Sequence, residues 1–228
     1  MRRTAAWLAL ACVALAACSS GGGKASTPTT TKSKAAGTDL TSLVDKAAKA
    51  SYKVIYQAGS ETVVVAQDPP KYSLVQSKTA IYGDGGDTFV ECSGTGLAAK
   101  CAELPSIGGD AKQSTAGSFG SVASTLFDAL AQAGPALGGL TYSNATIAGR
   151  AARCVTVDSK NLEAVIGDAL KGTLTICADK ETGVLLKSHI SSATGTTDIV
   201  AISFGPPTAA DFNPPTAPIP VASLDSTP

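Results

Sequence analysis

Residues 52–105 read YKVIYQAGSETVVVAQDPPKYSLVQSKTAIYGDGGDTFVECSGTGLAAKCAELP, and they carry the clearest secondary-structure pattern in the chain. Short runs of β-branched and aromatic residues alternate in it with Gly, Asp, Ser and Pro, which are typical of turns. The double proline at 69–70 interrupts the pattern, because proline has no N–H to donate to a neighbouring strand. The stretch predicts a meander of short strands at 52–56, 61–66, 71–75, 79–82, 88–92 and 98–104.

The rest of the chain adds strands and a few helices to this meander. Strand composition returns at 143–157, 173–177, 184–190 and 199–204. Apolar residues at helical spacing predict helices at 39–50, 121–133 and 161–170. Alternation within the strands leaves one face apolar and the other mixed, which suits an antiparallel sheet with helices on one side. The sequence therefore predicts an α+β fold built on a predominantly antiparallel β-sheet.

Length and charge exclude two broad classes. The 228 residues provide room for one domain, and 18 basic residues balance 18 acidic ones. Nucleic-acid binding is not expected, because it needs a basic surface that displaces counterions from phosphates. A chain that is disordered throughout is not expected either, because 44% hydrophobic residues without net charge can form a core.

The N-terminus predicts an exported protein. Arg2 and Arg3 precede an uncharged, largely apolar run at 5–17, which is shorter than the roughly 20 residues that span a bilayer as a helix. Residues 1–17 are therefore interpreted as a signal peptide rather than a transmembrane helix. The glycine- and serine-rich start of 18–38 and the Lys/Thr/Ala stretch that follows it predict a flexible tether.

The end of the apolar run, Leu15-Ala16-Ala17-Cys18, resembles the lipobox of bacterial lipoproteins. The resemblance implies that Cys18 receives a diacylglycerol and becomes the first residue of the mature chain. The protein would then be anchored to the cell membrane by its acyl chains and lie on the extracytoplasmic side. The alternative is a plain secretory signal with an incidental cysteine at this position.

Four cysteines remain after Cys12 and Cys18 are set aside, and an even number in an oxidising compartment predicts disulfides. Three connectivities are possible. We favour the two pairs that join neighbouring strands, the first across a short turn and the second across a helical excursion. Zinc binding is the rival, but neither pair has the close C-x₂-C spacing of zinc ligands. The favoured pairs are Cys92–Cys101 and Cys154–Cys177.

Patterns for catalysis, metal binding or cofactor binding are weak. Ser118 lies in a sequence that lacks the first glycine of a nucleophile elbow, and His189 is the only histidine that could serve as its base. Asp84 and Asp87 flank two glycines, which is more typical of a hairpin turn than of a calcium loop. The glycines near 108–112 lack the spacing of a phosphate-binding loop. We expect no enzyme activity, no metal and no cofactor.

The order of elements resembles the half-barrel of LolA/LprG-like envelope proteins over about residues 39–205. The resemblance is carried by the lipobox, the tether, the first helix and the strands interrupted by a helix. It is closest in the block TLTI (173–176), ETGVLLK (181–187) and IVAISFG (199–205). The alanine, glycine and threonine bias fits an actinobacterium. Residues 206–228 are interpreted as a proline-rich tail.

This resemblance implies a curved sheet that, with its helices, encloses a cavity for acyl chains. The expected function is binding or carrying a lipid or another hydrophobic ligand. The alternative is a non-enzymatic interaction or sensor lipoprotein with a filled core, whose protein partners the sequence does not name. The matching candidates for ligand contact are Val54, Tyr56, Val63, Val65, Leu74, Phe127 and Leu130.

Overall fold

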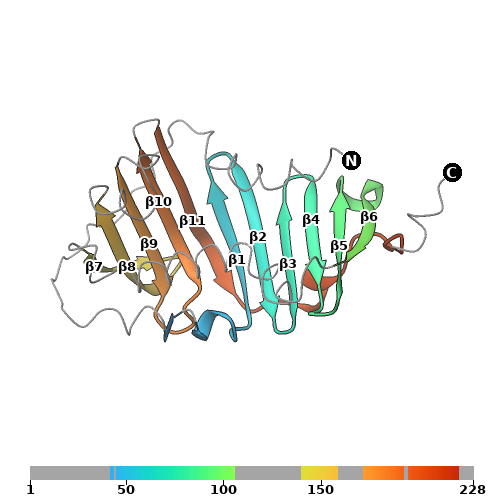
Figure 1. The fold of residues 1–228 in the computed structure, drawn as a ribbon, viewed down its shortest axis with the longest axis horizontal. Helices are drawn as coiled ribbons and strands as arrows, with labels where there is room; N and C mark the ends of the chain where they lie inside the picture. Colours follow the sequence, from blue (N-terminus) through green and yellow to red (C-terminus); the bar gives the residue numbers. More distant parts are fainter. Residues whose placement is uncertain (1–41, 44, 106–139, 159–171, 193–194, 221–228) are drawn as a thin grey trace.

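The computed structural model describes residues 42–43, 45–105, 140–158, 172–192 and 195–220. These residues form one sheet of 11 strands in the order β6-β5-β4-β3-β2-β1-β11-β10-β9-β8-β7 (Figure 1). The strands are β1 (Tyr52–Ala58), β2 (Glu61–Asp68), β3 (Lys71–Gln76), β4 (Thr79–Gly83), β5 (Thr88–Ser93), β6 (Lys100–Pro105), β7 (Thr141–Ile147), β8 (Arg150–Asp158), β9 (Thr173–Asp179), β10 (Leu185–Ser192) and β11 (Gly195–Gly205).

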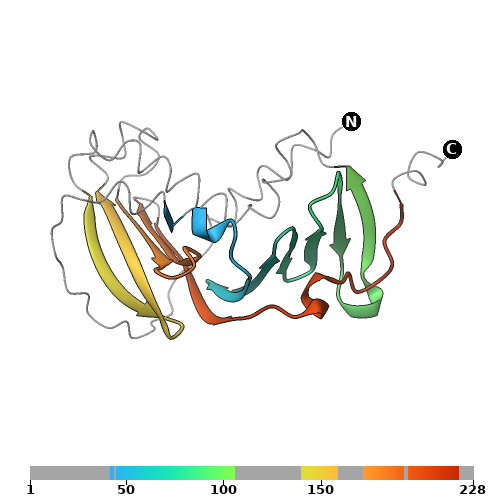
Figure 2. The same cartoon turned by 90° about the horizontal axis from the view of Figure 1, so that it is seen from below.

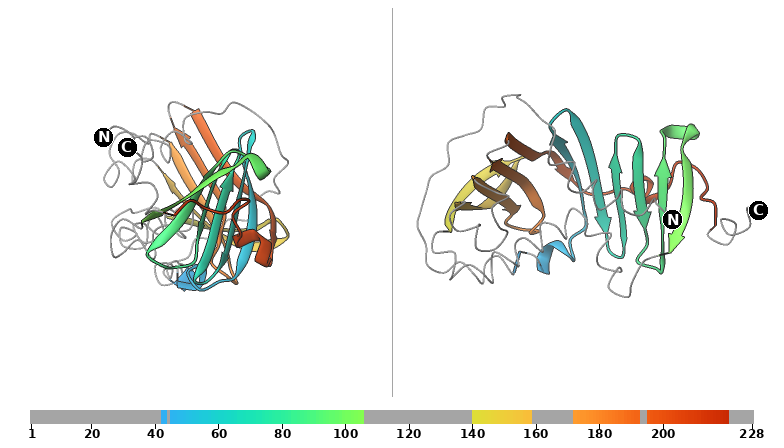
Figure 3. Two further views of the ribbon diagram at one scale, coloured as in Figure 1. Left: turned by 90° about the vertical axis from the view of Figure 1, so that its right-hand side faces the viewer. Right: turned by 45° about the horizontal axis from the view of Figure 1, so that its top comes forward.

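Two antiparallel meanders make up the sheet. The first runs from β1 to β6 and the second from β7 to β11, and the first and last strands of the chain join them side by side. Within the described residues β6 and β7 do not pair with each other, so the sheet is open rather than a closed barrel. It is strongly curved, as the edge-on view of Figure 2 shows, and twists progressively from strand to strand (Figure 3).

The first meander has the six strands that its sequence predicts, each within two residues of its expected bounds. The prediction of a single strand at 143–157 is wrong, because the chain folds there into the hairpin β7–β8. Ala148 and Gly149 form the turn with positive φ values of 50° and 74°. That combination matches the twist of a two-residue hairpin. Because alanine rarely adopts positive φ, an Ala-Gly pair is a weak turn signal and the hairpin was not predicted.

Helices contribute little to the described part of the molecule. Residues 42–43 and 45–47 are helical, within the helix predicted at 39–50. Two short 3₁₀ helices follow, η1 (Gly96–Ala98) and η2 (Ala209–Phe212). The helices predicted at 121–133 and 161–170 lie outside the described residues. Over the described ranges, no helix has the length and apolar character needed to cross a membrane.

The helical residues at 42–43 and 45–47, called the helical segment below, mark the inner, concave face of the sheet (Figure 2). The Gln67 side-chain amide, which lies on this face, donates to the carbonyls of Ala47 (2.9 Å) and Ala50 (3.0 Å). A Cβ added at Gly183, in the β9–β10 turn, would lie 1.8 Å from the carbonyl oxygen of Leu43. The segment is thus held against both meanders.

The main core cluster crosses the junction of the two meanders. The Tyr56 hydroxyl donates to the carbonyl of Leu185 on β10 over 2.7 Å, and the ring of Tyr52 stacks on Phe204 of β11. Burial raises the pKa of Tyr52 to about 12 and the pKa of Tyr56 well above its ordinary value, so both hydroxyls stay protonated. The buried members are Tyr52, Val54, Tyr56, Val63, Val65, Ile147, Ala152, Cys154, Cys177, Val184, Leu186 and Ala201.

Both disulfides join residues that lie directly opposite each other on neighbouring strands. Cys92–Cys101 links β5 to β6, and Cys154–Cys177 links β8 to β9. All four cysteines are buried. These are the two pairs that the sequence favours among the three possible connectivities.

The C-terminal segment at 206–220 crosses the outer face of the first meander (Figure 2). Lys53, on the outer face of β1, forms an ion pair with Asp211 of η2. The Thr216 hydroxyl donates to the carbonyl of Ala99 over 3.0 Å. Ile219 then forms a parallel bridge to Ala102 on the edge strand β6. We call residues 206–220 the C-terminal strap.

Candidate functional site

On the inner face of the first meander, side chains from neighbouring strands lie opposite one another and form rows that run across the strands. Antiparallel pairing places six residues directly opposite one another, one from each strand from β1 to β6. Because directly opposed residues share a face, all six side chains lie on one side of the sheet. We call this set the inner-face row, and its members are Val54, Val65, Leu74, Ile81, Glu91 and Ala102.

The structure brings together five of the seven residues predicted to contact a ligand. Val54, Tyr56, Val63 and Val65 are fully buried in the core cluster, and half-buried Leu74 packs against that cluster. These five share the inner face of β1, β2 and β3. The two helix residues, Phe127 and Leu130, lie outside the described residues.

Burial decreases along this face from the centre of the sheet toward the β6 edge. Val54 is 0% exposed, whereas Leu74, Ile81, Phe89 and Leu104 are only half-buried. All four half-buried residues are large and apolar, and each lies on the inner face by register. The inner face of β3–β6 is therefore an apolar surface that the described part of the chain leaves partly accessible.

A polar row borders this apolar surface. The row that begins with Tyr56 and Val63 continues as polar residues once it reaches β3. The inner face thus has an apolar part and a polar margin. This arrangement complements an amphiphile, which has an apolar chain and a polar headgroup. The polar members are Gln76, Thr79, Ser93 and Lys100.

Glu91 is the single charged member of the inner-face row. Its direct cross-strand neighbours are Ile81 and Ala102, and Phe89 lies two residues before it on the same face. Burial raises the pKa of its carboxyl above the ordinary value. Glu91 was not among the residues predicted from the sequence, although the alternation in residues 88–93 places it on the same face as Phe89.

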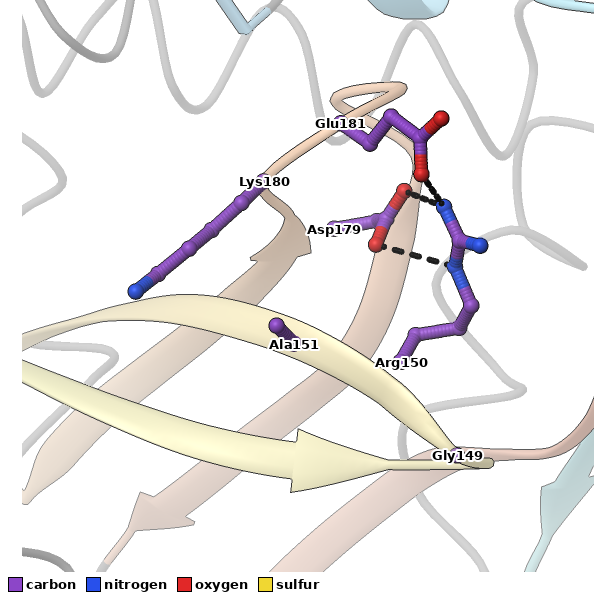
Figure 4. A pocket seen from close by; sticks show the side chains of 6 residues that line it. All are labelled: Gly149, Arg150, Ala151, Asp179, Lys180 and Glu181. Carbon is purple, nitrogen blue, oxygen red and sulfur yellow. Dashed lines mark hydrogen bonds and ion pairs between the residues drawn. The ribbon is translucent and has the colours of Figure 1, made fainter.

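A second feature is a small pocket of about 150 Å³ at the turns that end β7 and β9 (Figure 4). The Arg150 guanidinium donates to both carboxylate oxygens of Asp179, at 3.2 and 2.9 Å, and to Glu181 at 2.7 Å. Asp179 also accepts from the backbone N–H and the hydroxyl of Thr182, at 3.0 and 2.6 Å. We call these four residues the polar clamp.

The charges and hydrogen bonds of the polar clamp indicate a structural role. Burial alone would raise the pKa of Asp179, but hydrogen bonds from Arg150 and Thr182 outweigh it and lower the pKa. The hydrogen bond to Asp179 raises the pKa of Arg150. The guanidinium also lies 4.8 Å from the ring centroid of Phe204. Because carboxylates and an aromatic ring already engage it, Arg150 joins β8, β9 and β11 rather than offering a free cation to a ligand.

The weaker sequence candidates have other partners. His189 lies on β10 and its Nδ1 is 2.7 Å from Oδ1 of Asp198 on β11, in a partly exposed pair. Asp84 accepts the backbone N–H of Gly86 at 2.9 Å, as in a turn. Ser118 and the glycines near 108–112 lie outside the described residues. Nowhere in the described ranges do three His, Cys, Asp or Glu side chains gather as metal ligands do.

Comparison with solved structures finds similar chains, each at low sequence identity and with a TM-score below 0.5. Neither the protein-family models nor the curated proteins give a match to this sequence. MucB is similar with a TM-score of 0.46 and 16% identity over 79% of this chain and 63% of MucB. MucB in complex with MucA(peri) gives 0.38 and 14% over 78% and 59%. LprF from Mycobacterium bovis gives 0.36 and 14% over 79% and 98%.

This chain thus spans less than two thirds of the length of MucB in both structures. At these TM-scores and identities, neither a shared fold nor a residue role is inferred from the likeness. The strand order and the curvature of the sheet define the class of fold on their own, and it is an open, curved, antiparallel half-barrel.

Proposed function

We propose that this chain is a membrane-anchored envelope lipoprotein, of the LolA/LprG-like kind found in actinobacteria, that binds a lipid or another hydrophobic ligand. The observation that carries the proposal is the inner face of β3–β6. Leu74, Ile81, Phe89 and Leu104 form an apolar surface there that is only half-buried. Apolar surface of this kind gains free energy when a hydrophobic partner removes it from water, at about 25 cal/mol per Å².

The proposed location rests on the N-terminal sequence. The lipobox at 15–18 supplies the anchor on Cys18, and the tether at 18–38 gives the domain reach from the membrane. The two disulfides agree with an extracytoplasmic compartment, since cytoplasmic thiols are kept reduced. The proposed role is non-enzymatic, since the patterns for catalysis in the sequence are weak and Ser118 lacks the first glycine of a nucleophile elbow.

An interaction or sensor lipoprotein without a ligand is the second candidate function. It is favoured by a specific observation, the complete burial of Val54, Tyr56, Val63 and Val65 in the core cluster. Because these four side chains already pack within the core cluster, no ligand is needed to cover them. The two functions differ in whether the inner face of β3–β6 holds a lipid or faces a protein.

Native mass spectrometry separates the two functions. The chain from position 18 onward, carrying Cys18→Ser so that no acyl group is attached, is exported behind a cleavable secretory signal peptide and purified without detergent. A bound lipid near one-to-one stoichiometry supports the proposed function. A clean unliganded mass that stays unchanged when lipid is added contradicts it.

Leu74 and Val75 provide a matched pair of variants, because they are adjacent, half-buried and on opposite faces of β3. Leu74→Gln should lower the bound lipid fraction, since it places an amide on the apolar inner face. Val75→Gln makes a similar change on the outer face and should leave lipid binding intact. Equal effects of the two variants would show that lipid does not occupy the inner face.

A further inference from the structure

We propose that the inner face selects amphiphiles whose headgroup carries an ammonium, and that Glu91 is the residue that binds it. This inference rests on the proposed function and deepens it, because it names the chemical class of the ligand. It is built on where Glu91 lies in the sheet and on what surrounds its carboxylate.

The position of Glu91 is unusual for a carboxylate. Five of the six residues in the inner-face row are apolar, and Glu91 interrupts them between Ile81 and Ala102. Phe89 flanks it along β5, and Leu104 lies opposite Phe89 on the next strand. A strand that only had to face the core would carry an apolar residue at this place in the row.

The Glu91 carboxylate also lacks a partner among the described residues, although burial takes away part of its hydration and raises its pKa. Glu103 provides the contrast, because it lies on the neighbouring strand β6 but on the outer face. Its carboxylate accepts the hydroxyl of Thr88 at 2.8 Å. A carboxylate that is partly removed from water without a partner is destabilising, and a cation that approaches it restores the lost interaction.

The polar margin of the inner face fixes which way an amphiphile would lie. Apolar Leu74, Phe89 and Leu104 suit a hydrocarbon chain, whereas Ser93 and Lys100 lie beyond Glu91 at the polar margin. A headgroup placed at this margin would reach the Glu91 carboxylate while its chains cover the apolar surface.

The charges at the polar margin further restrict the class of headgroup that the inner face could bind. Lys100 shares the inner face and is exposed, and it forms no ion pair with Glu91 among the described residues. A separated carboxylate and ammonium match a headgroup that carries both an ammonium and a phosphate. Phosphatidylethanolamine has this chemistry, whereas phosphatidylglycerol presents the phosphate and hydroxyls alone.

A competition between these two lipids tests the proposal. The chain from position 18 onward, carrying Cys18→Ser, is mixed with equal amounts of phosphatidylethanolamine and phosphatidylglycerol that have identical acyl chains. Native mass spectrometry measures the ratio of the two bound forms. We expect about a tenfold preference for phosphatidylethanolamine, the size of one charge-assisted hydrogen bond at a half-buried site.

Glu91→Gln keeps the side-chain shape and removes the charge, so it should bring the ratio close to one. Glu103→Gln removes the same charge from the outer face of the neighbouring strand and should keep the wild-type ratio. A wild-type ratio near one overturns the proposal without any variant, and so does a preference that survives in Glu91→Gln. Those results leave lipid binding itself intact, whereas an absence of both lipids contradicts the proposed function as well.

Discussion

Replacing Arg150 by methionine tests the polar clamp in the most detail. The methionine side chain keeps an apolar stem beside Phe204 and removes the guanidinium that bridges Asp179 and Glu181. The Asp179 side chain is 2% exposed, so its carboxylate would stay buried with only the two hydrogen bonds from Thr182. Leaving one member of a buried ion pair in this state is strongly destabilising.

The size of the loss follows from the exposures of the three groups. Removing one partner of a buried pair costs about 3–5 kcal/mol. The Arg150 side chain is itself 29% exposed and Thr182 continues to donate hydrogen bonds to Asp179, so we expect a loss of about 3 kcal/mol. Glu181 is 78% exposed, so its pair with Arg150 adds well under about 1 kcal/mol.

Urea unfolding followed by circular dichroism at pH 7, with disulfides intact, measures this loss. Asp179→Asn and the double variant with Arg150→Met complete a double-mutant cycle. We expect the double variant to be clearly less destabilised than the sum of the single variants, because the two side chains act on each other. A loss below about 0.5 kcal/mol for Arg150→Met, with additive effects, would refute the argument.

The pH dependence of the same unfolding provides an independent check. The pKa of Asp179 in the folded protein lies below its ordinary value of 3.8, so its stabilising contribution is complete above that value. That contribution is lost as the pH falls through the lowered pKa. In Arg150→Met burial is opposed by Thr182 alone, so the loss of stability between pH 7 and pH 3 should shrink. An unchanged pH profile would show that Arg150 does not hold the pKa of Asp179 down.

Three further predictions concern other parts of the chain. Removing the Cys92–Cys101 disulfide, which closes a loop of 9 residues, should lower the free energy of unfolding in urea by about 2.6 kcal/mol. Removing Cys154–Cys177, which closes a loop of 23 residues, should lower it by about 3.4 kcal/mol. The reverse order of the two losses would contradict the explanation by loop entropy. Gly183→Ala should lower the melting temperature by at least about 5 °C, because φ is +75° and the added methyl meets the helical segment; an unchanged melting temperature would show that the segment does not pack there. Cys18→Ser should move the protein from the membrane fraction and remove the mass of the acyl groups; retention of that mass would place the anchor elsewhere.

Local sequence patterns predicted all six strands of the first meander because each hairpin is specified by neighbouring residues. Residues 52–105 contain both the alternating runs and the turns between them, so each strand pairs with the next. The pairing of Cys92 with Cys101 follows from the same local hairpin. Pairing between strands that are distant in the sequence could not be predicted in this way. Nothing near Tyr52 or Phe204 specifies that β1 pairs with β11, at the opposite end of the described chain.

The C-terminal strap covers part of the outer face of β2 and β3, which sequence patterns did not predict. Ala66 and Ser73 lie on the outer face and are nevertheless buried, because η2 of the strap lies against β3. Strands covered on both sides lose the simple alternation of apolar and polar residues. The prolines at the end of the chain predict an irregular segment, but composition alone does not say whether such a segment docks.

Glu91 was missed for a related reason. The run TFVECS at 88–93 is mixed on both faces, since Val90 and Cys92 face outward under the strap while Phe89 and Glu91 face inward. A glutamate in a short strand is ordinarily assigned to the solvent side. Only the register across the strands from β1 to β6 shows that it stands in an apolar row.

Photo-cross-linking in the bacterial envelope tests the central claim, lipid binding on the inner face, most directly. A benzophenone amino acid is placed at Ile81, on the inner face of β4, or at Tyr82, on the outer face, and both positions are half-buried. If lipid lies on the inner face, a lipid adduct forms on the protein cross-linked at position 81 and none forms at position 82. Cross-links to protein alone at position 81, or lipid adducts of equal yield at both positions, would contradict it.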